Sequence, residues 1–446
     1  MIKHIYRILL TLIFITLISI VYLSTIGIKT NKFNSKIISQ IKKIEPNINL
    51  KLNDVSVTLD PLNFRLNLKT LGTDFLYRDK IIGIETIKSK ISLKSFLNNN
   101  LAFTEISIST KSLVIKDLIT FIKLLNNDPK IFIAEKIIKK GFLVANLKLK
   151  FDDSGTIVEN YEFNGLVKDG KIDLLNKIDL NKIDFTFAIN EKIFSFNGIK
   201  ITLNNNNLSI PNLIFSRQKN EYLISGKLIT DNTRFFKDEI EKLFGNNFSK
   251  FGVQEIVFSS KNDFKFKLNK KLKVKNLNIV SDIDLNNLKF RNSLKLKDFF
   301  PKITDDLIFK NHKLRVEYKK NNLNITGSGE ALLQDKIDKI NYDINKKDDE
   351  ITFKKKLKIS KNPVSIDLIN FKKEKNSILE LNLSGKNVLH KKLFFDEITL
   401  KEKKKIISIQ KLILSKDNKI EDLHNIKIDF IDDDNLRNHL KLTKKN

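Results

Sequence analysis

The stretch "INLKLNDVSVTLDPLNFRLNLKTLG", residues 48–72, alternates apolar and polar side chains over almost its whole length. Successive side chains of a β-strand point to opposite faces, so this pattern predicts strands with one apolar and one polar face. The parity of the apolar positions changes at Asn53-Asp54 and at Asp60-Pro61, which are turn-forming pairs. The stretch therefore predicts three strands that fold back on one another. Their apolar positions are Ile48, Leu50 and Leu52, then Val55, Val57 and Leu59, then Leu62, Phe64, Leu66 and Leu68.

The same alternation continues along the chain. It is clearest in "LVANLKLKF" (143–151), "IDFTFAI" (183–189) and "IFSFNGIKITL" (193–203), where Phe185, Phe187, Phe194 and Phe196 have the apolar parity. Roughly twenty such strand candidates are bounded by Asn, Asp, Gly or Lys turns. Helical spacing is confined to a few short segments, within residues 33–44, 118–127, 131–140, 232–245 and 294–309, and the third of these could also be a strand. The sequence therefore predicts a mainly β protein with few helices to cover the apolar face.

Composition limits the possible functions. A chain of 446 residues predicts two or more domains or one elongated repeat structure. Its 81 Lys and Arg against 52 Asp and Glu give a net charge of +29, which indicates either an anionic partner or the base composition of an AT-rich genome. The lysines are spread along the chain and alternate with phenylalanines that belong to the opposite face, so nucleic acid is not an expected partner.

Residues 8–28, "ILLTLIFITLISIVYLSTIGI", carry no charge. Their length matches the ~20 residues that an α-helix needs to cross a bilayer, and it exceeds the usual apolar core of a signal peptide. We therefore predict an uncleaved transmembrane signal anchor, with residues 1–7 as a cytoplasmic tail and the remainder exported. Cleavage near Thr25 and Gly27 is the alternative. An amphipathic helix that ends at Pro46 is expected to follow.

Motifs that carry chemistry are not evident. The five His residues do not fall at metal-ligand spacing, and each is expected at the surface or at a strand edge. The absence of Cys excludes thiolate metal sites, thiol nucleophiles and disulfides. The turn "TGSGE" (326–330) lacks the Lys-Ser/Thr of a phosphate-binding loop. The sequence predicts neither an enzyme nor a cofactor or metal site.

An apolar helix followed by "INLKLNDVSVTLDPLNFRLNLKTLGTDF" and "IIGIETIKSKISLKSFLNNNLAFTEISISTKSLVIKD" resembles the chorein-like N-terminal region of the AsmA-like bacterial envelope proteins, of the TamB and YhdP type. The strand-and-glycine units between Tyr161 and Asn387 are similar to the central part of the YhdP branch. The resemblance implies a chorein-like region over residues 29–142 and a repetitive β-groove body over residues 143–446. It also implies an elongated antiparallel sheet that curls lengthwise into a groove.

The resemblance further implies a protein of the bacterial inner membrane, anchored through residues 8–28, with its body in the periplasm and a role in lipid transport or outer-membrane homeostasis. Phospholipid acyl chains are the expected ligand, and an outer-membrane or envelope assembly protein is a possible partner. The alternative is a non-catalytic structural or adaptor protein with a closed β-sandwich core. Groove-lining residues are expected to be Ile48, Leu50, Leu62, Phe64, Leu66, Phe185, Phe187, Phe194 and Phe196.

Overall fold

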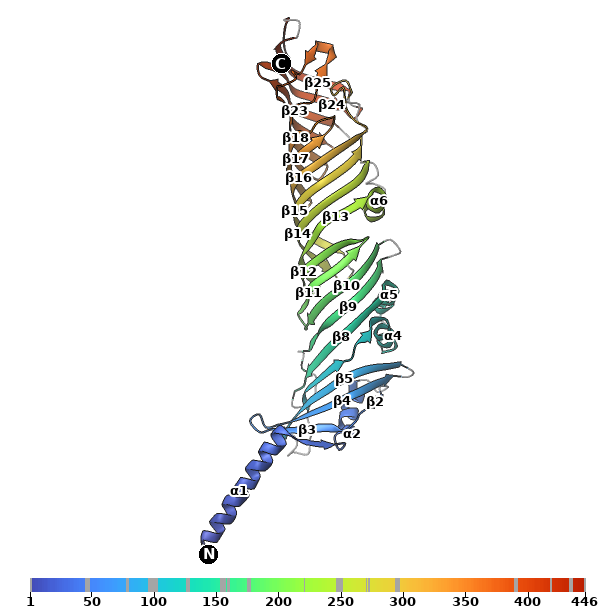
Figure 1. Ribbon diagram of the computed structural model, residues 1–446, viewed down its shortest axis with the longest axis vertical. Coiled ribbons are helices and arrows are strands. Elements are labelled where there is room, and N and C mark those ends of the chain that lie inside the picture. The colour runs from blue at the N-terminus through green and yellow to red at the C-terminus, as the bar shows by residue number, and fades with distance from the viewer. Residues whose placement is uncertain are drawn as a thin grey trace. The chain divides into compact units, whose positions relative to one another are not determined.

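The structure is a computed structural model of the chain (Figure 1). It describes residues 2–44, 49–77, 80–94, 103–125, 129–152, 158, 161–174, 178–219, 221–245, 252–269, 271, 273–292, 297–388, 392–417, 419–432 and 436–444.

The prediction of a mainly β protein is confirmed. One sheet contains 24 strands, and a separate piece contains only the two short strands β20 (Ser365–Ile366) and β21 (Phe371–Lys372). Strand follows strand in antiparallel register along most of the chain, as in the pairing of β18 (Asp338–Lys347) with β19 (Glu350–Ile359). The predicted antiparallel sheet is thus confirmed, whereas the predicted lengthwise curl is not. Among the described residues, the only other sheet is this two-stranded piece.

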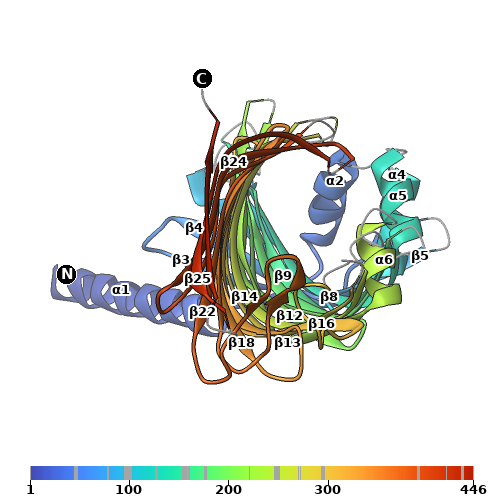
Figure 2. The same ribbon diagram turned by 90° about the horizontal axis from the view of Figure 1, so that it is seen from above.

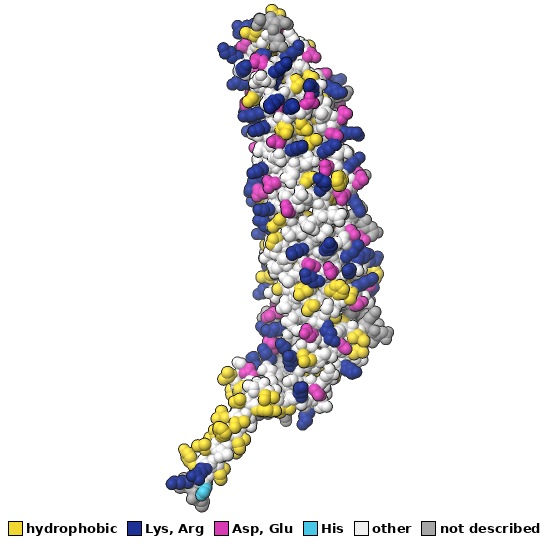
Figure 3. Space-filling view, in the orientation of Figure 1, with side chains coloured by type: hydrophobic (Ala, Val, Ile, Leu, Met, Phe, Trp, Pro, Cys, Tyr) yellow, Lys and Arg dark blue, Asp and Glu magenta, His cyan; other side chains and the backbone are white. Residues whose placement is uncertain are grey.

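The N-terminal apolar stretch forms the helix α1 (Ile2–Thr25). Its residues 3–25 are long and apolar enough to cross a membrane, and none of this segment is buried against the rest of the chain. Figure 3 shows it as a continuous run of hydrophobic side chains. The helix ends three residues earlier than the predicted span, because the chain turns at Gly27, whose φ is 70°. An exposed apolar helix at this place is consistent with a membrane anchor or a signal sequence.

Two compact units make up the chain, and each is described by itself. The first comprises residues 1–202 and 212–219. Besides α1, it contains β1 (Ile28–Thr30), α2 (Asn34–Ile44), β2 (Asn49–Lys51), β3 (Val55–Asp60), β4 (Arg65–Tyr77), β5 (Lys80–Ser92), β6 (Phe103–Thr110), β7 (Leu113–Val114), α4 (Ile115–Leu125), α5 (Pro129–Ile137), β8 (Ile138–Lys150), β9 (Glu162–Leu174), β10 (Ile178–Ile189) and β11 (Ile193–Leu203).

The amphipathic helix predicted after the apolar span is confirmed as α2. Its Ile37 is buried against strands β2 to β6, where Leu68, Ile87 and Ile91 form the centre of a core. Pro46, the expected helix terminator, lies outside the described residues. The helix thus covers the apolar face of the first strands, and Figure 2 shows it standing beside the sheet.

The strand prediction for residues 48–72 is wrong at one point. Leu62 and Phe64 lie in the turn between β3 and β4, where they are 92% and 64% exposed. Phe64 has a φ of 52°, which lies in the left-handed region and outside the β region. Asp60 stabilises this turn by accepting hydrogen bonds from the backbone and the side-chain amide of Asn63. The turn therefore occupies four residues, 61–64, and the next strand begins only at Arg65.

Helices were also predicted within residues 118–127 and 131–140, and the structure places α4 and α5 there. The two helices pack against each other beside the sheet (Figure 2). On α4, Ile115 and Leu118 contact the apolar face around Leu143 of β8. The predicted boundary between residues 142 and 143 falls inside β8, so it does not coincide with a break in the sheet.

The second unit comprises residues 203–211 and 220–446, and β12 (Asn206–Gln218) contributes residues to both units. Its elements, besides β18 to β21, are β13 (Glu221–Phe236), α6 (Lys237–Phe244), β14 (Val253–Asn269), β15 (Val274–Arg291), β16 (Asp306–Lys319), β17 (Asn322–Leu332), η2 (Asp367–Ile369), β22 (Leu379–Val388), β23 (Lys392–Glu402), β24 (Lys405–Ser415), β25 (Ile420–Ile431) and β26 (Arg437–Thr443).

Part of the apolar face of the second unit is covered by irregular chain instead of helix. Residues 361–378, which we call the cover segment, bury Val364 and Phe371 against Ile359 and Leu379 of the sheet. Phe300 and Ile303, which lie in the loop before β16, pack into the same core. A helix was predicted over residues 294–309, but the described part, 297–309, is turn and then strand. The helix predicted within residues 232–245 is confirmed as α6.

Candidate functional site

The first unit contains an apolar pocket of about 270 Å³. It lies on the face of the sheet that α4 partly covers, and strands β8 to β11 form its floor. Charged residues contribute to its lining at two positions, Lys140 and Lys171, and Lys171 pairs with Asp179 at 3.1 Å. The other lining residues are Ile115, Ile138, Leu143, Phe163, Val167, Gly170, Ile172, Ile183, Phe185, Phe187, Ile189 and Phe196.

Strand register explains why these side chains meet. In the ladder β8–β9–β10, Leu143 lies opposite Val167, and Val167 lies opposite Phe185. In the next row on the same face, Ala145 lies opposite Gly165, and Gly165 lies opposite Phe187. Alternation then places every second residue of each strand on this face, which therefore becomes continuously apolar.

Aromatic rings form most of the pocket wall. The ring centroids of Phe163 and Phe187 lie 5.0 Å apart, and those of Phe185 and Phe196 lie 5.8 Å apart in an edge-to-face arrangement. Phe196 in turn contacts Phe215 of β12 at 5.6 Å. Such offset and edge-to-face pairs stabilise a cluster beyond the burial of its area. Phe187 is only 6% exposed, whereas Phe185 and Phe196 keep intermediate exposure, so the cluster has a buried base and an accessible rim.

Glycine is required at one position beneath these rings. A Cβ atom on Gly165 would lie 2.2 Å from the carbonyl oxygen of Val144 and 2.9 Å from the Phe187 ring. The Phe187 ring can therefore lie directly over the backbone of β9 only because Gly165 has no side chain. This glycine belongs to one of the strand-and-glycine units found in the sequence. It is needed because the Phe187 ring approaches the backbone closely, and not because of a positive φ.

The residues that the sequence predicted to line the groove do not all lie at the pocket. Phe185, Phe187 and Phe196 line the pocket, and Phe194 lies two residues before Phe196 on β11 without lining it. Leu50 and Leu66 instead pack into the core beneath α2. Leu62 and Phe64 are exposed in the β3–β4 turn, as described above, and Ile48 lies outside the described residues.

Most of the pocket lining was not predicted, and Ile115 and Leu143 show two different reasons. Ile115 contacts it from α4, and Leu143 closes the row of Val167 and Phe185. Leu143 has the apolar parity of its strand, so its place could have been read from alternation. Ile115 could not, because helix α4 reaches this face only through the tertiary fold.

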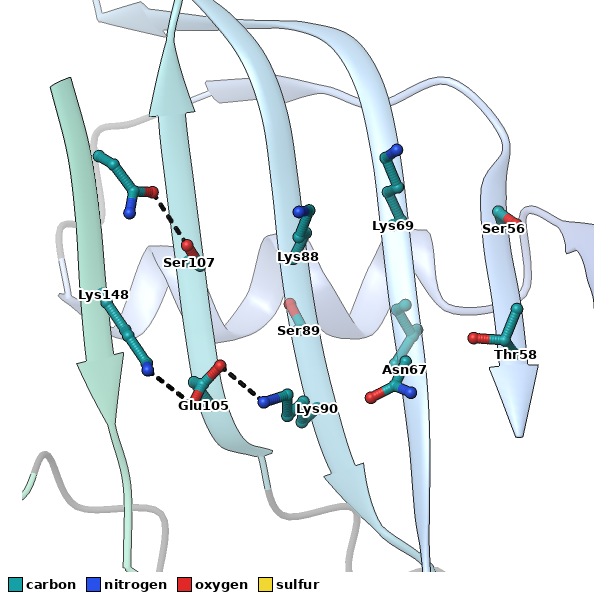
Figure 4. A pocket seen from close by; sticks show the side chains of 12 residues that line it. Ser56, Thr58, Asn67, Lys69, Lys88, Ser89, Lys90, Glu105, Ser107 and Lys148 are labelled. Carbon is teal, nitrogen blue, oxygen red and sulfur yellow. Dashed lines mark hydrogen bonds and ion pairs between the residues drawn. The ribbon is translucent and has the colours of Figure 1, made fainter. Parts of the chain in front are cut away.

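The opposite, polar face of the same unit carries a lysine-rich depression of about 580 Å³ (Figure 4). Figure 4 shows its side chains pointing away from α2, which passes behind the sheet. Glu105 pairs with Lys90 at 3.0 Å and with Lys148 at 3.5 Å. Burial raises the pKa of Glu105, but the hydrogen bonds and charges of these lysines outweigh burial and lower the pKa below its usual value. Lys69 and Lys88 lie directly opposite each other on β4 and β5.

The described residues contain no group of three or more His, Asp and Glu side chains placed to hold a metal ion. The prediction that every His lies at the surface or at a strand edge is wrong for His312. This residue is only 1% exposed and lies on the apolar face of the second unit. Its ring nitrogens are occupied by Tyr342 and by the carbonyl oxygen of Glu330.

Comparison with protein-family models finds no match, and comparison with curated proteins finds none either.

Proposed function

We propose that this protein is a membrane-anchored carrier that shields phospholipid acyl chains on the apolar face of its sheet. The observation that carries the proposal is the pocket of about 270 Å³ whose lining is almost entirely aliphatic and aromatic. A site with so few polar groups favours an apolar ligand over a polar metabolite. Each buried methylene of an acyl chain would contribute about 0.8 kcal/mol relative to water.

Partial exposure of the aromatic rim supports an apolar ligand. Phe185 and Phe196 retain intermediate exposure although their strands are well ordered by pairing and by ring contacts. Soluble proteins seldom leave a large contiguous apolar patch uncovered unless it contacts another molecule. An acyl chain that lies across these rings would remove them from water.

The short distance along the chain between the apolar helix α1 and the first strands of the sheet supports a lipid as that ligand. Helix α1 is apolar and exposed along its length, and β1, which follows it, pairs with β3 through Ile28 and Val57. The sheet that forms the pocket therefore begins within a few residues of the segment proposed to cross the bilayer. A membrane lipid could then reach the same sheet that forms the pocket.

The finer parts of the proposal follow the resemblance of the sequence to the AsmA-like family. We infer that α1 is an uncleaved anchor in the inner membrane, that the body lies in the periplasm, and that the sheet bends into a groove around its lipid. A role in lipid transport or outer-membrane homeostasis would follow, with an envelope partner at the far end of the transport path. An adaptor protein without bound lipid is the competing function.

Lipid analysis of the purified full chain distinguishes a lipid carrier from an adaptor protein. Phe185→Asp combined with Phe196→Asp puts two charges into the pocket rim and should remove most co-purifying phospholipid, because a buried carboxylate disfavours acyl chains. Extraction in organic solvent followed by mass spectrometry measures the lipid per protein. An adaptor would show no stoichiometric lipid in the unaltered protein.

The matched control places the same charges on the opposite face of the same strands. Thr186 is exposed between Phe185 and Phe187, and Ser195 lies between Phe194 and Phe196. Thr186→Asp combined with Ser195→Asp should leave lipid content unchanged, and circular dichroism should report equal strand content in both variants. Equal lipid loss in both variants, or no loss in the pocket variant, would contradict the proposal.

A further inference from the structure

A lysine interrupts the apolar face of the second unit. On β19 the side chains of Phe353, Lys355, Leu357 and Ile359 alternate with polar ones and so share a face. Leu357 and Ile359 are buried in the core beneath the cover segment, which identifies this face as the apolar one. Lys355 therefore stands where the pattern of the strand calls for an apolar residue.

Neighbouring strands supply no charge at this level. The residue opposite Lys355 on β18 is Tyr342, and the one on β22 is Leu383. On its own strand the ammonium lies 5.5 Å from the centroid of the Phe353 ring. Among the residues that the structure describes, Lys355 makes no ion pair and no hydrogen bond with an acidic group. Lys355 is exposed at the surface, although desolvation by its apolar neighbours lowers the pKa of its ammonium.

Tyr342 cannot act as a counter-charge. Burial raises its pKa to about 12, so the phenol stays neutral at physiological pH. The Nε2 atom of His312 lies 2.9 Å from the carbonyl oxygen of Glu330 and must donate to it. Burial lowers the pKa of His312, which favours the neutral ring, and its Nδ1 then accepts a hydrogen bond from the Tyr342 hydroxyl at an N···O distance of 3.0 Å.

The aromatic pair is held in a fixed position beside the lysine. A Cβ atom on Gly327 would lie 2.8 Å from the Tyr342 ring, so this ring rests directly on the backbone of β17. Its hydroxyl is fixed by His312, which is buried on β16. The residues directly opposite Lys355 are therefore uncharged and Tyr342 is held in place, so an anion that reached the ammonium would meet no competing carboxylate from them.

Lys355 also marks the edge of the covered region. Leu357 and its partners Ile340 and Leu381 belong to the core beneath the cover segment. On the other side of Lys355, Phe353 lies opposite Ile344, and Ile344 lies opposite Ile325, all with intermediate exposure. An uncovered apolar strip thus begins at Lys355, and its next row contains Ile351, Lys346 and Leu323.

We propose that Lys355 binds the anionic headgroup of a phospholipid whose acyl chain lies on the strip formed by Phe353, Ile344 and Ile325. The inference rests on the proposed function and deepens it by naming the class of lipid, one with a net negative headgroup. An ammonium at the end of an apolar strip is complementary to an amphiphile with an oxyanion at the end of an apolar tail.

Substitution of Lys355 by Met tests the headgroup contact, because Met keeps the length and removes the charge. The full chain in a neutral detergent is equilibrated with equal amounts of phosphatidylglycerol and phosphatidylcholine, and bound lipid is extracted and quantified. The unaltered protein should enrich phosphatidylglycerol, and Lys355→Met should reduce this enrichment roughly tenfold, the effect of one charge-assisted hydrogen bond, with total lipid unchanged.

Lys354→Met is the matched control, because Lys354 is the preceding residue and points to the polar face. It should behave as the unaltered protein. Equal enrichment in Lys355→Met, or equal loss in both variants, would overturn the inference while the proposed function stood. Displacement of the lipid by millimolar inorganic phosphate would identify a free-phosphate site and overturn it as well. Absence of lipid from the unaltered protein would instead refute the proposed function.

Amine acylation provides a second measurement that needs no variant. Mass spectrometry of the unaltered chain gives the acylation rates of Lys355 and Lys354 with acetic anhydride. Phosphatidylglycerol vesicles should slow the reaction of Lys355 severalfold and leave that of Lys354 unchanged, and vesicles of phosphatidylcholine alone should protect neither. Equal protection of the two lysines would contradict a headgroup contact at Lys355.

Discussion

At the scale of residues, the pocket depends on a small number of close contacts. Gly165 allows the Phe187 ring to lie against β9, and Phe187 in turn supports Phe163 and Phe185. A side chain at residue 165 would meet backbone as well as a ring, and backbone cannot move aside as a flexible side chain can. The pocket is thus sensitive to a single methyl group.

Gly165→Ala should therefore lower the free energy of unfolding by about 1–3 kcal/mol, the usual effect of overpacking. Gly83→Ala is the control, because a Cβ atom there would meet only the Lys111 side chain, at 3.1 Å. That control should change the free energy of unfolding by less than about 0.5 kcal/mol. Urea unfolding of the full chain in detergent, followed by circular dichroism, compares the two, and equal stability would argue against the packing described here.

At the scale of elements, the cover segment is held by a buried polar cluster. Asn362 donates to Asp338 at 2.7 Å, and the backbone N–H of Ser360 donates to the same carboxylate at 3.1 Å. The Lys373 ammonium donates to the carbonyl oxygen of Ser360 at 2.7 Å. The segment is thus fixed to β18 and β19 by hydrogen bonds as well as by Phe371, and it sets the limit of the uncovered strip beside Lys355.

Asp338 should make this attachment dependent on pH. It is 2% exposed, and burial raises its pKa although Asn362 and Ser360 oppose that shift. Because the folded pKa lies above the unfolded one, this group contributes most stability below the unfolded pKa and loses that contribution as pH rises through the folded pKa. The unaltered protein should therefore gain stability relative to Asp338→Asn as pH falls from 7 to 4.

Urea unfolding of both proteins at several pH values checks this expectation. Carboxylates with lowered pKa, such as Glu374 and Glu380, destabilise both proteins in acid and cancel in the difference. A difference in unfolding free energy that stays constant with pH would show that Asp338 does not titrate in this range.

At the scale of the whole molecule, the proposed function requires the body and the N-terminal tail to lie on opposite sides of the membrane. The chain contains no Cys, so single cysteines can report on sidedness without a background. Lys416, in the loop after β24, and Lys3, which precedes the uncharged residues 8–28, are both exposed.

Lys416→Cys should react with a membrane-impermeant maleimide in cells whose outer membrane has been permeabilised. Lys3→Cys should react only after the inner membrane is opened, because residues 1–7 are proposed to be cytoplasmic. Mass increase or gel shift of the labelled chain measures the reaction. The reverse pattern would place the body in the cytoplasm and remove the basis for a periplasmic carrier.

Much of the fold could be predicted from the sequence, because alternation of side chains is a local property of the strand. It identified the apolar face, the strands of the pocket floor and the place of Phe185, Phe187 and Phe196 on that face. Lys355 also has the apolar parity, but the run "KKK" at residues 354–356 conceals it among its neighbours. Turn length could not be predicted, since Leu62 and Phe64 continue the pattern although the strand has already ended.

By itself the sequence determined the apolar N-terminal helix, the mainly β body and the separation of each strand into two faces, because these depend on residues close together in the chain. Only the tertiary structure decided which parts of the apolar face are covered. Helix α2 covers the first strands, and the cover segment covers strands of the second unit. Ile115 completes the pocket, and Lys355 remains at an uncovered edge. These outcomes depend on contacts between residues far apart in sequence, which periodicity does not encode.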